Sequence, residues 1–356
     1  MKKFVFFYAF VLVIVLTTIL LYMNTLDKKN NKKENTESEF KENIEQKYEE
    51  LDELKLKEIK EKIKLKISST GEIKELKISE YIKGVLPAEM PPEYHIEALK
   101  AQAVVARTYL YKKMSGNAHN DADICDNPSH CQAWYSLDKL YGIWQRSKGY
   151  TLEECNMYFT KVEEAVDSTE NIVVTYKNKY INAYFHACSG DKTEDVSAIW
   201  GKQNIPYLVS VESKGEEGYK NYTSKVKLTV SDLETKLNNS SSRECSINKE
   251  SENVVEILSY TKSGRVDKVK IGGVVYKAEE LRTLLGLRST NFTVNKEGAE
   301  VVFNVKGNGH GVGMSQVGAD YYAKEGFTYI GIIKHYYTGV NVTKIYVEGE
   351  TKENEI

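Results

Sequence analysis

The sequence predicts an α+β fold, in which mixed β-hairpins and small sheets surround an Ala-rich helix, preceded by one transmembrane helix and a charged stalk. Three observations lead to this prediction. Short pairs of segments with alternating apolar residues are separated by turn residues, which is typical of hairpins. Other segments carry the three-to-four-residue periodicity of amphipathic helices. Strands and helices do not alternate regularly, so the parallel sheet of an α/β protein is not expected.

Composition limits the classes of function. The 356 residues suffice for one large domain or two ordinary ones. Lysine and arginine together number 49, against 51 for aspartate and glutamate, so the net charge of -2 gives no support for a nucleic-acid partner. The 25 tyrosines favour a groove for sugars or peptides, because aromatic side chains commonly line ligand sites.

The amino terminus predicts a membrane anchor in residues 1–23. An uncharged apolar run from Phe4 to Met23 is long enough for a helix to cross the roughly 30 Å core of a bilayer. No small-residue cleavage pattern follows it, so we expect an uncleaved signal anchor with the body of the protein outside the cytoplasm. The lysines directly after the run favour the opposite orientation under the positive-inside rule.

Residues 24–62 predict a solvated, partly helical stalk. They are dominated by Lys, Glu and Asn and contain no proline or glycine, so their charges are expected to face solvent. A polar tail is expected over residues 349–356. The apolar residues of the stalk recur at helical spacing and are Phe40, Ile44, Tyr48, Leu51, Leu54 and Ile59.

A globular domain is predicted to span residues 63–348 and to begin with a hairpin around the turn SSTG. Residues 63–67 alternate in polarity before this turn, and residues 73–78 alternate after it. Further strand pairs are expected at 172–176 with 180–187, at 254–261 with 265–271, and at 292–294 with 301–305. Helices are expected at 96–114, at 231–237 behind a Ser231-x-x-Glu234 capping box, at 278–285, at 314–324 and at 329–337, with an exposed loop over 238–253.

The stretch VLPAEMPPEYHIEALKAQAVVARTY carries a candidate catalytic acid, Glu89. Pro87 holds Leu86 in extended geometry, and Pro92 suits the first turn of a helix. We therefore expect Glu89 in a short, stiff connection ahead of the helix over 96–114. A carboxyl group in a partly apolar setting has a raised pKa and can act as a general acid at neutral pH. The alternative interpretation is a surface glutamate or a helix cap.

The loop HNDADICDNPSHCQAW predicts a metal site. His119, Cys125 and Cys131 are spaced six and six apart in a polar loop that can wrap a tetrahedral zinc with nitrogen and sulfur ligands. A disulfide between the two cysteines, or calcium binding by the aspartates, explains the same residues. With five cysteines in the chain, an all-disulfide scheme leaves one over. Spare ligand candidates in the loop are His130, Asp121 and Asp123.

Two glycine-rich segments, FHACSG and GNGHGVGMSQVGA, are candidates for a ligand site. Their glycines let the backbone approach a bulky ligand, and their Ser, Gln and His side chains offer hydrogen bonds to hydroxyl groups. Ordinary loop turns explain the glycines as well. The polar candidates are His186 and Ser189 in the first segment, and His310, Ser315 and Gln316 in the second.

These four motifs, in this order between about Ile63 and Tyr346, resemble the SpoIID/LytB family. The resemblance implies a peptidoglycan lytic transglycosylase that cleaves the MurNAc-GlcNAc bond of glycan strands, preferably stripped of peptides, in engulfment during endospore formation. Such enzymes use no water: an acid protonates the leaving oxygen, and the sugar's own primary hydroxyl closes an anhydro ring. One carboxylate can therefore suffice, because the nucleophile is intramolecular.

The resemblance also implies roles for individual residues. Glu89 falls on the family's catalytic glutamate and would act first as acid and then as base. His119, Cys125 and Cys131 match positions that bind zinc in some members, and we expect one structural zinc that shapes the cleft. Cys188 stands where small or hydroxyl residues are usual, which departs from the family pattern. The residues expected to line the glycan groove are His186, Ser189, His310, Gly311, Ser315 and Gln316.

Partners and location follow from the same resemblance. An enzyme that acts on denuded glycan needs the stem peptides removed first, so the amidase SpoIIP and the membrane protein SpoIIM are expected partners. The expected location is the mother-cell membrane, held by the single amino-terminal helix, with the catalytic domain outside the cytoplasm.

Two other classes of function stay open. The protein could be a zinc-dependent peptidoglycan amidase or peptidase, although catalytic zinc sites keep one position open and commonly use histidine with carboxylate. It could also be a non-catalytic module that binds the cell wall, in which case replacing Glu89 would leave its role untouched.

Overall fold

The computed structural model describes residues 52–56, 60–116, 119–201, 204–240 and 243–347. Contacts divide the chain into Met1–Glu50 and Leu51–Ile356, and all described residues belong to the second unit. Within them, no helix is long and apolar enough to span a bilayer. The predicted anchor, most of the stalk and the polar tail lie outside the described residues.

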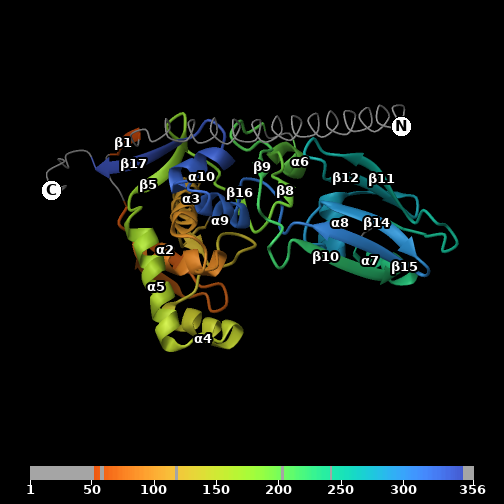
Figure 1. Ribbon diagram of the computed structural model, residues 1–356, viewed down its shortest axis with the longest axis horizontal. Helices are drawn as coiled ribbons and strands as arrows, with labels where there is room; N and C mark the ends of the chain where they lie inside the picture. Colours follow the sequence, from red (N-terminus) through yellow and green to blue (C-terminus); the bar gives the residue numbers. More distant parts are fainter. Residues whose placement is uncertain (1–51, 57–59, 117–118, 202–203, 241–242, 348–356) are drawn as a thin grey trace, which may run out of the picture. The chain divides into compact units, whose positions relative to one another are not determined.

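The helix α3 (Ile96–Met114) is the centre of the helical part and confirms the predicted bounds. It contacts α2, α5, α9 and α10 (Figure 1). Its alanines at 98, 101, 103 and 106 have no exposed surface, so neighbouring helices can approach its backbone closely. The other helices are α2 (Ile78–Glu89), α4 (Leu137–Lys148), α5 (Leu152–Asp167), α6 (Val196–Trp200), α7 (Val230–Ser240), α8 (Ala278–Leu285), α9 (Gln316–Lys324) and α10 (Tyr329–Tyr336).

Small sheets flank these helices, as expected of an α+β fold. One has the order β1-β17-β5-β6, with β1 parallel to β17, and a second has the order β3-β2-β4. Two-stranded sheets join β16 to β7 and β8 to β9. These strands are β1 (Asp52–Leu56), β2 (Lys62–Lys66), β3 (Ile73–Lys77), β4 (Ile124–Cys125), β5 (Ile172–Tyr176), β6 (Lys179–Tyr180), β7 (Phe185–His186), β8 (Asp191–Lys192), β9 (Glu212–Ser213), β16 (Met314–Ser315) and β17 (Asn341–Val347).

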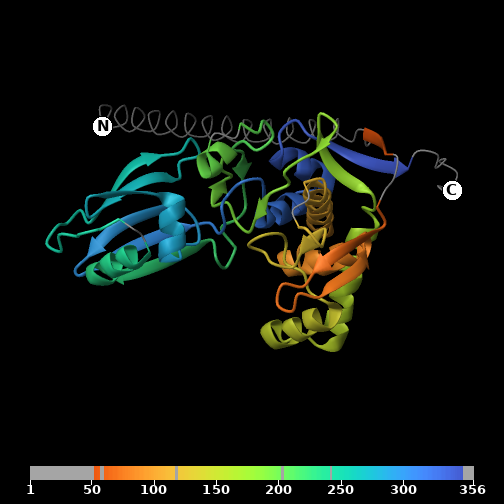
Figure 2. The same cartoon turned by 180° about the vertical axis from the view of Figure 1, so that it is seen from behind.

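The strands β10 to β15, with α7 and α8, form a region with its own hydrophobic core, which we call the β-module. It contains two three-stranded sheets, β10-β15-β14 and β11-β12-β13. Helix α7 packs against β10 and β15, and α8 packs against β12 and β13 (Figure 2). Its strands are β10 (Thr223–Thr229), β11 (Val255–Tyr260), β12 (Val266–Ile271), β13 (Val274–Lys277), β14 (Phe292–Glu297) and β15 (Glu300–Lys306).

Two predictions near the amino-terminal side of the domain are wrong. Residues 52–56, expected in the partly helical stalk, form β1, because pairing with β17 supplies backbone hydrogen bonds that local periodicity does not report. Residues 78–89 form α2, with Pro87 inside the helix, whereas Leu86 was expected to be extended and Glu89 to lie in a short, stiff connection. Burial of Tyr81, Ile82 and Val85 on one face of α2 offsets the cost of the proline.

Other expectations are confirmed in part. The hairpins β2-β3, β11-β12 and β14-β15 are present. Helices α4 and α5 were not expected, although Thr151 and Glu154 form a capping box at the start of α5. Helix α7 is capped by Thr229, which accepts from the Asp232 amide, in place of the predicted Ser231 box. The expected loop over 238–253 is not simply exposed, since Cys245 is buried in the core of the β-module.

Candidate functional site

Glu89 is the last residue of α2 and is partly buried. Its Oε1 accepts a hydrogen bond of 2.7 Å from the backbone N–H of Ala133. Burial raises the pKa of Glu89 above its ordinary value, and the Ala133 hydrogen bond only partly offsets this effect. The carboxyl-terminal end of a helix carries partial negative charge, which also disfavours the ionised form. Both effects favour the protonated form of the Glu89 carboxyl.

The segment that holds Glu89 runs directly on from the predicted metal loop. Gln132 accepts a hydrogen bond of 3.3 Å from the hydroxyl of Tyr81 on α2. The amide of Tyr135 donates to the carbonyl of Gly84, also on α2, at 3.2 Å. A Cβ atom at Gly84 would lie 2.2 Å from the indole nitrogen of Trp134, so only glycine allows this approach. Residues 131–135 thus lie along α2 and bring a backbone donor to the acid.

Four side chains of the loop meet in a single cluster. The ligand atoms of His119, Cys125, His130 and Cys131 all lie within 4.8 Å of one another. Nε2 of His119 lies 3.3 Å from Sγ of Cys131, and Nδ1 of His130 lies 3.3 Å from Sγ of Cys131 and 3.6 Å from that of Cys125. Both cysteines are free thiols rather than a disulfide. Two nitrogen and two sulfur ligands within this range suit a tetrahedral zinc.

The cluster differs from the predicted ligand set by one residue. His130, considered only as a spare candidate, joins the three expected ligands. The aspartates of the loop lie elsewhere, since Asp121 pairs with Lys66 at 2.8 Å and Asp123 pairs with Lys60 at 2.7 Å. Burial raises the pKa of the Cys131 thiol to about 11. A bound cation would favour the thiolate, so metal binding at this cluster would release a proton.

Tyr109 on α3 connects the central helix to the loop with the His and Cys cluster. Its hydroxyl donates to the carbonyl of His130 at 3.3 Å. Burial raises the pKa of Tyr109 above its ordinary value. Nothing in the stretch ARTYLYKK distinguishes this tyrosine from its neighbours, so sequence reasoning missed it.

An aromatic group includes Tyr184. Its ring centroid lies 4.7 Å from that of Trp200 and 6.4 Å from that of His310. His310 in turn lies 5.2 Å from Trp200 and 5.7 Å from His186. Trp200 is 42% exposed, which is unusual for a large aromatic side chain packed against two others. We call Tyr184, Trp200 and His310 the aromatic wall.

The two glycine-rich motifs come together through the parallel pairing of β7 with β16. His186 is buried, with Nδ1 3.1 Å from the Val312 carbonyl and Nε2 2.8 Å from the Ser189 hydroxyl. Ser315 is buried as well, caps α9 and donates to the carboxylate of Glu216. These side chains make hydrogen bonds within the protein, and direct contact with glycan stays a prediction for each of them.

The remaining predicted groove residues differ in exposure. Gln316 is buried and donates to Gln102 on α3 at 3.4 Å. Gly311 is buried with a φ of +83°, which strongly favours glycine. His310 is only partly buried and belongs to the aromatic wall, and burial and two arginines lower its pKa to about 4. Of the six expected groove residues, His310 is the best placed to reach a ligand.

Comparisons with known proteins identify the family of this chain. A family model described as stage II sporulation protein (SpoIID) matches residues 66–176. Stage II sporulation protein D of Bacillus amyloliquefaciens is 32% identical over 280 residues, covering 78% of this chain and 77% of that protein. The chain belongs to the stage II sporulation protein D family. Stage II sporulation protein D of Bacillus subtilis strain 168 is 32% identical over 275 residues, which cover 76% of each chain. The amidase enhancer of the same strain is 27% identical over 309 residues, which cover 74% of this chain and 40% of the enhancer.

The SpoIID family model covers the chain from β2 to β5, which includes Glu89 and the complete metal-ligand cluster. A second model, described as a domain of unknown function (DUF8618), matches residues 158–313, from within α5 to the glycine-rich loop. The aromatic wall and the β-module lie in this second region. The candidate site of this SpoIID family member is therefore built from both matched regions.

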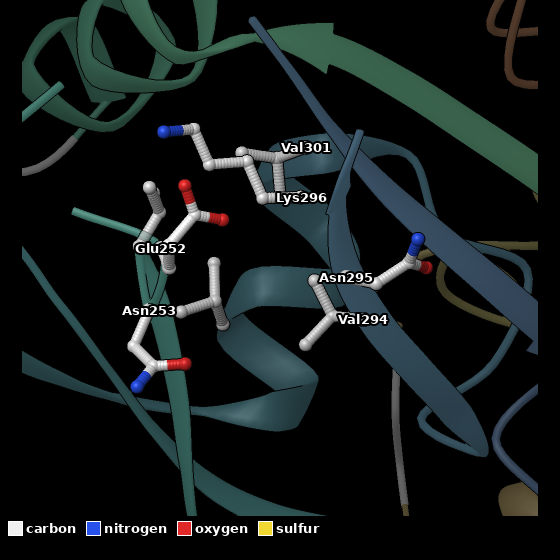
Figure 3. A pocket seen from close by; sticks show the side chains of 8 residues that line it. Glu252, Asn253, Val294, Asn295, Lys296 and Val301 are labelled. Carbon is white, nitrogen blue, oxygen red and sulfur yellow. The ribbon is translucent and has the colours of Figure 1, made fainter. Parts of the chain in front are cut away.

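A pocket of about 300 Å³ lies elsewhere, in the β-module (Figure 3). Its lining includes Glu252, Asn253 and Lys296, and none of the residues around Glu89. The ammonium group of Lys296 donates to the carbonyls of Lys249 and Ser251 at 3.0 and 3.1 Å. Lys296 is the one cationic side chain that lines the pocket, and its ammonium group is already bonded to the protein. We therefore assign no part of the candidate site to this pocket.

Proposed function

We propose that this SpoIID family member is a peptidoglycan lytic transglycosylase that cleaves MurNAc-GlcNAc bonds in engulfment during endospore formation. The observation that carries the proposal is the partly buried carboxyl of Glu89, which accepts a hydrogen bond from the Ala133 amide and whose pKa is raised by burial. Only burial and the Ala133 amide act on this pKa, and no acidic neighbour in the described part of the chain contributes. A paired carboxylate at the spacing used by retaining glycosidases would interact strongly with it.

One carboxyl group suffices for the proposed reaction. Protonated Glu89 donates its proton to the glycosidic oxygen as the bond from that oxygen to C1 of MurNAc breaks. The resulting carboxylate accepts the proton of the C6 hydroxyl of the same sugar as its oxygen bonds to C1, which closes the anhydro ring. Glu89 is then protonated again, and no water or second carboxylate takes part. The partly apolar surroundings of Glu89 suit the first, proton-donating step.

We propose that the cluster of His119, Cys125, His130 and Cys131 holds one structural zinc. A zinc ion bound there would cross-link the loop through four side chains. Four protein ligands would fill its tetrahedral coordination shell, as in structural zinc sites. The amide of Ala133 lies two residues after the proposed ligand Cys131. A stable loop would therefore maintain the hydrogen bond from this amide to Glu89. A zinc-dependent amidase would need an open coordination position, which four protein ligands do not leave.

The aromatic wall and Tyr109 are proposed to contact the glycan. Aromatic faces with a polar edge are common where sugars bind, since they combine apolar area with a few directed hydrogen bonds. The hydroxyl of Tyr109 donates to the carbonyl of His130, three residues before the Ala133 amide that donates to Glu89, and Tyr184 packs against Trp200. A strand lying along these rings would pass beside the acid.

The test is product analysis by mass spectrometry with peptide-stripped glycan strands and the full-length chain. We expect anhydro-ended fragments from the unmodified protein and none from Glu89→Gln, which keeps the shape and removes the acid. Glu93→Gln is the matched control, since Glu93 lies four residues away and is bonded to Lys148 and Tyr150. Reducing ends would indicate a hydrolase, and wall binding without cleavage would favour the binding-module interpretation.

Location and partners complete the proposal. We propose that residues 1–23 anchor the protein in the mother-cell membrane with the catalytic domain outside the cytoplasm. The amidase SpoIIP and the membrane protein SpoIIM are proposed partners, because denuded glycan requires prior removal of stem peptides. Co-purification from sporulating cells with an anchored and an anchorless chain would test both points.

A further inference from the structure

Arg265 of the β-module reaches out of its own module into the region of the two glycine-rich motifs. It precedes β12 directly, and its side chain is 2% exposed. Its Nη2 donates to the carbonyl of Ser189 at 2.6 Å and to that of Lys192 at 3.3 Å. The guanidinium group thus holds the turn that follows β7 through backbone atoms.

The same guanidinium group lies against the glycine-rich loop. A Cβ atom at Gly311 would stand 2.7 Å from Cζ of Arg265 and 2.7 Å from its Nη2. A side chain at this position would therefore collide with the guanidinium group. Two features thus require glycine at position 311. Its φ of +83° is unfavourable for other residues, and Arg265 leaves no room for a side chain.

A buried carboxylate fixes the turn that carries Arg265. Oε2 of Glu194 accepts hydrogen bonds of 2.6 Å from the hydroxyls of both Thr261 and Ser263, which lie between β11 and β12. The backbone N–H of Glu194 donates to the carbonyl of Gly311 at 2.8 Å. Glu194 therefore connects the tip of the β11-β12 hairpin to the glycine-rich loop.

The burial of Arg265 is costly in itself. Two of its nitrogens, Nε and Nη1, are buried without a hydrogen-bond partner among the described residues. The nearby carboxylates of Glu194 and Glu216 stabilise its charge without a direct ion pair. Buried guanidinium groups with unused donors are destabilising, so an apolar side chain would serve better if only packing mattered.

The contacts of Arg265 lead directly to the aromatic wall. His310 precedes Gly311, and its Nδ1 accepts the N–H of Val312 at 3.0 Å. The ring of His310 stands 5.2 Å from that of Trp200, measured between centroids. A shift of the loop at Gly311 would therefore move His310 and change the surroundings of Trp200.

We propose that Arg265 is a positioning residue, which clamps the 189–192 turn and the glycine-rich loop together and so sets the place of His310 and Trp200 in the glycan groove. The inference rests on the proposed function, because that function identifies glycan as the ligand. It also gives the β-module a role in the candidate site. Glu89 and Ala133 lie outside these contacts, so the clamp acts on substrate binding more than on the proton transfer.

The first readout separates binding from chemistry. Arg265→Ala in the full-length chain is expected to raise KM for peptide-stripped glycan about tenfold and to leave kcat within about twofold. Arg265→Lys keeps a cation that can reach the Ser189 carbonyl and should recover part of this loss. Lys268→Ala, at an exposed position on β12, is the matched control and should change neither constant.

The second readout does not depend on activity. The chain has three tryptophans, so 5-fluorotryptophan gives three resolvable ¹⁹F signals that single Trp→Phe variants assign. Arg265→Ala should shift the signal of Trp200 and leave that of Trp144, which packs in a separate core with Leu140, in place. If Arg265→Ala fails to fold, the double variant Thr261→Val with Ser263→Ala can be used, because it removes the two hydroxyls that bind Glu194 and so loosens the same hairpin. Its Trp200 signal should shift in the same direction by a smaller amount.

The outcomes separate the two proposals. An unchanged Trp200 signal together with an unchanged KM would overturn the clamp, as would a fall in kcat at constant KM. If the unmodified protein forms no anhydro ends, the proposed function fails, while a Trp200 shift in Arg265→Ala would still support the positioning of the wall.

Discussion

At the scale of single residues, the chemistry of Glu89 depends on where its helix ends. The backbone of α2 brings the carboxyl to a partly buried position with one amide donor, and burial raises its pKa. Its location was predicted from sequence as a stiff extended connection, whereas the structure has a helix that contains Pro87. The expectation of a raised pKa agrees with the structure, although the local geometry behind it was wrong.

The raised pKa of Glu89 makes its ionised form costly to the folded state. A carboxyl whose folded pKa exceeds its unfolded value binds more protons when folded, so the free energy of unfolding falls as the pH rises through the window between the two values. Glu89→Gln should therefore stabilise the protein at neutral pH by about 0.5–1 kcal/mol. Thermal unfolding from pH 4 to 8 checks this, and the gain should vanish at the acid end, where Glu89 is protonated in both states. An equal gain at all pH values would contradict it.

The metal-ligand cluster gives a second prediction at this scale. Cys131→Ser replaces one of four clustered ligands, so we expect bound zinc to fall from about one ion per chain to a small fraction. Elemental analysis of the purified protein measures this directly. Cys155→Ser is the matched control, because Cys155 is buried between α4 and α5 away from the cluster and should leave the zinc content unchanged. Loss of zinc in the control alone would refute the assignment of the ligands.

At the scale of elements, the fit of residues 131–135 on α2 depends on Gly84. Its missing side chain admits Trp134, whose indole nitrogen would stand 2.2 Å from an added Cβ. Gly84→Ala should therefore destabilise the protein by about 1–3 kcal/mol and lower glycan cleavage, because the segment that carries the Ala133 donor must move. Denaturant unfolding and product analysis measure the two effects.

A glycine in another helix supplies the control for that substitution. Gly142 lies within α4, where an added Cβ would meet only the flexible end of Arg146. Gly142→Ala should stabilise the protein by about 0.5–1 kcal/mol, since alanine is the better helix former. If both substitutions destabilised the protein equally, the close approach of Trp134 would not be the cause.

Elements with strong local signals were predicted well. Helix α3 has the expected bounds because its apolar and alanine pattern persists over five turns, and the β2-β3 hairpin follows from alternation around a turn. Strand β1 was missed because its partner β17 lies almost three hundred residues away in the sequence. Helices α4 and α5 were missed although their capping residues were visible.

At the scale of the whole molecule, segments from distant parts of the sequence build the candidate site. Glu89, Tyr109 and the His and Cys cluster lie between residues 89 and 131, while His310 follows the last strand of the β-module. The parallel pairing of β7 with β16 joins the two glycine-rich motifs across more than a hundred residues. Arg265 of the β-module contacts the first motif, and the β11-β12 hairpin is bonded to Glu194, whose backbone contacts the second motif. The β-module therefore helps to build the proposed groove.

Local patterns in the sequence predict the α+β class, the central helix, several hairpins and the motifs that led to the family. They also include the candidate acid and three of the four residues of the His and Cys cluster, because these signals reside in short, contiguous segments. The tertiary structure alone decided that His130 joins the cluster, that His186 and Ser315 are buried, and that Arg265 reaches Gly311. Burial and contact depend on residues far apart along the chain, and periodicity within one segment carries no information about them.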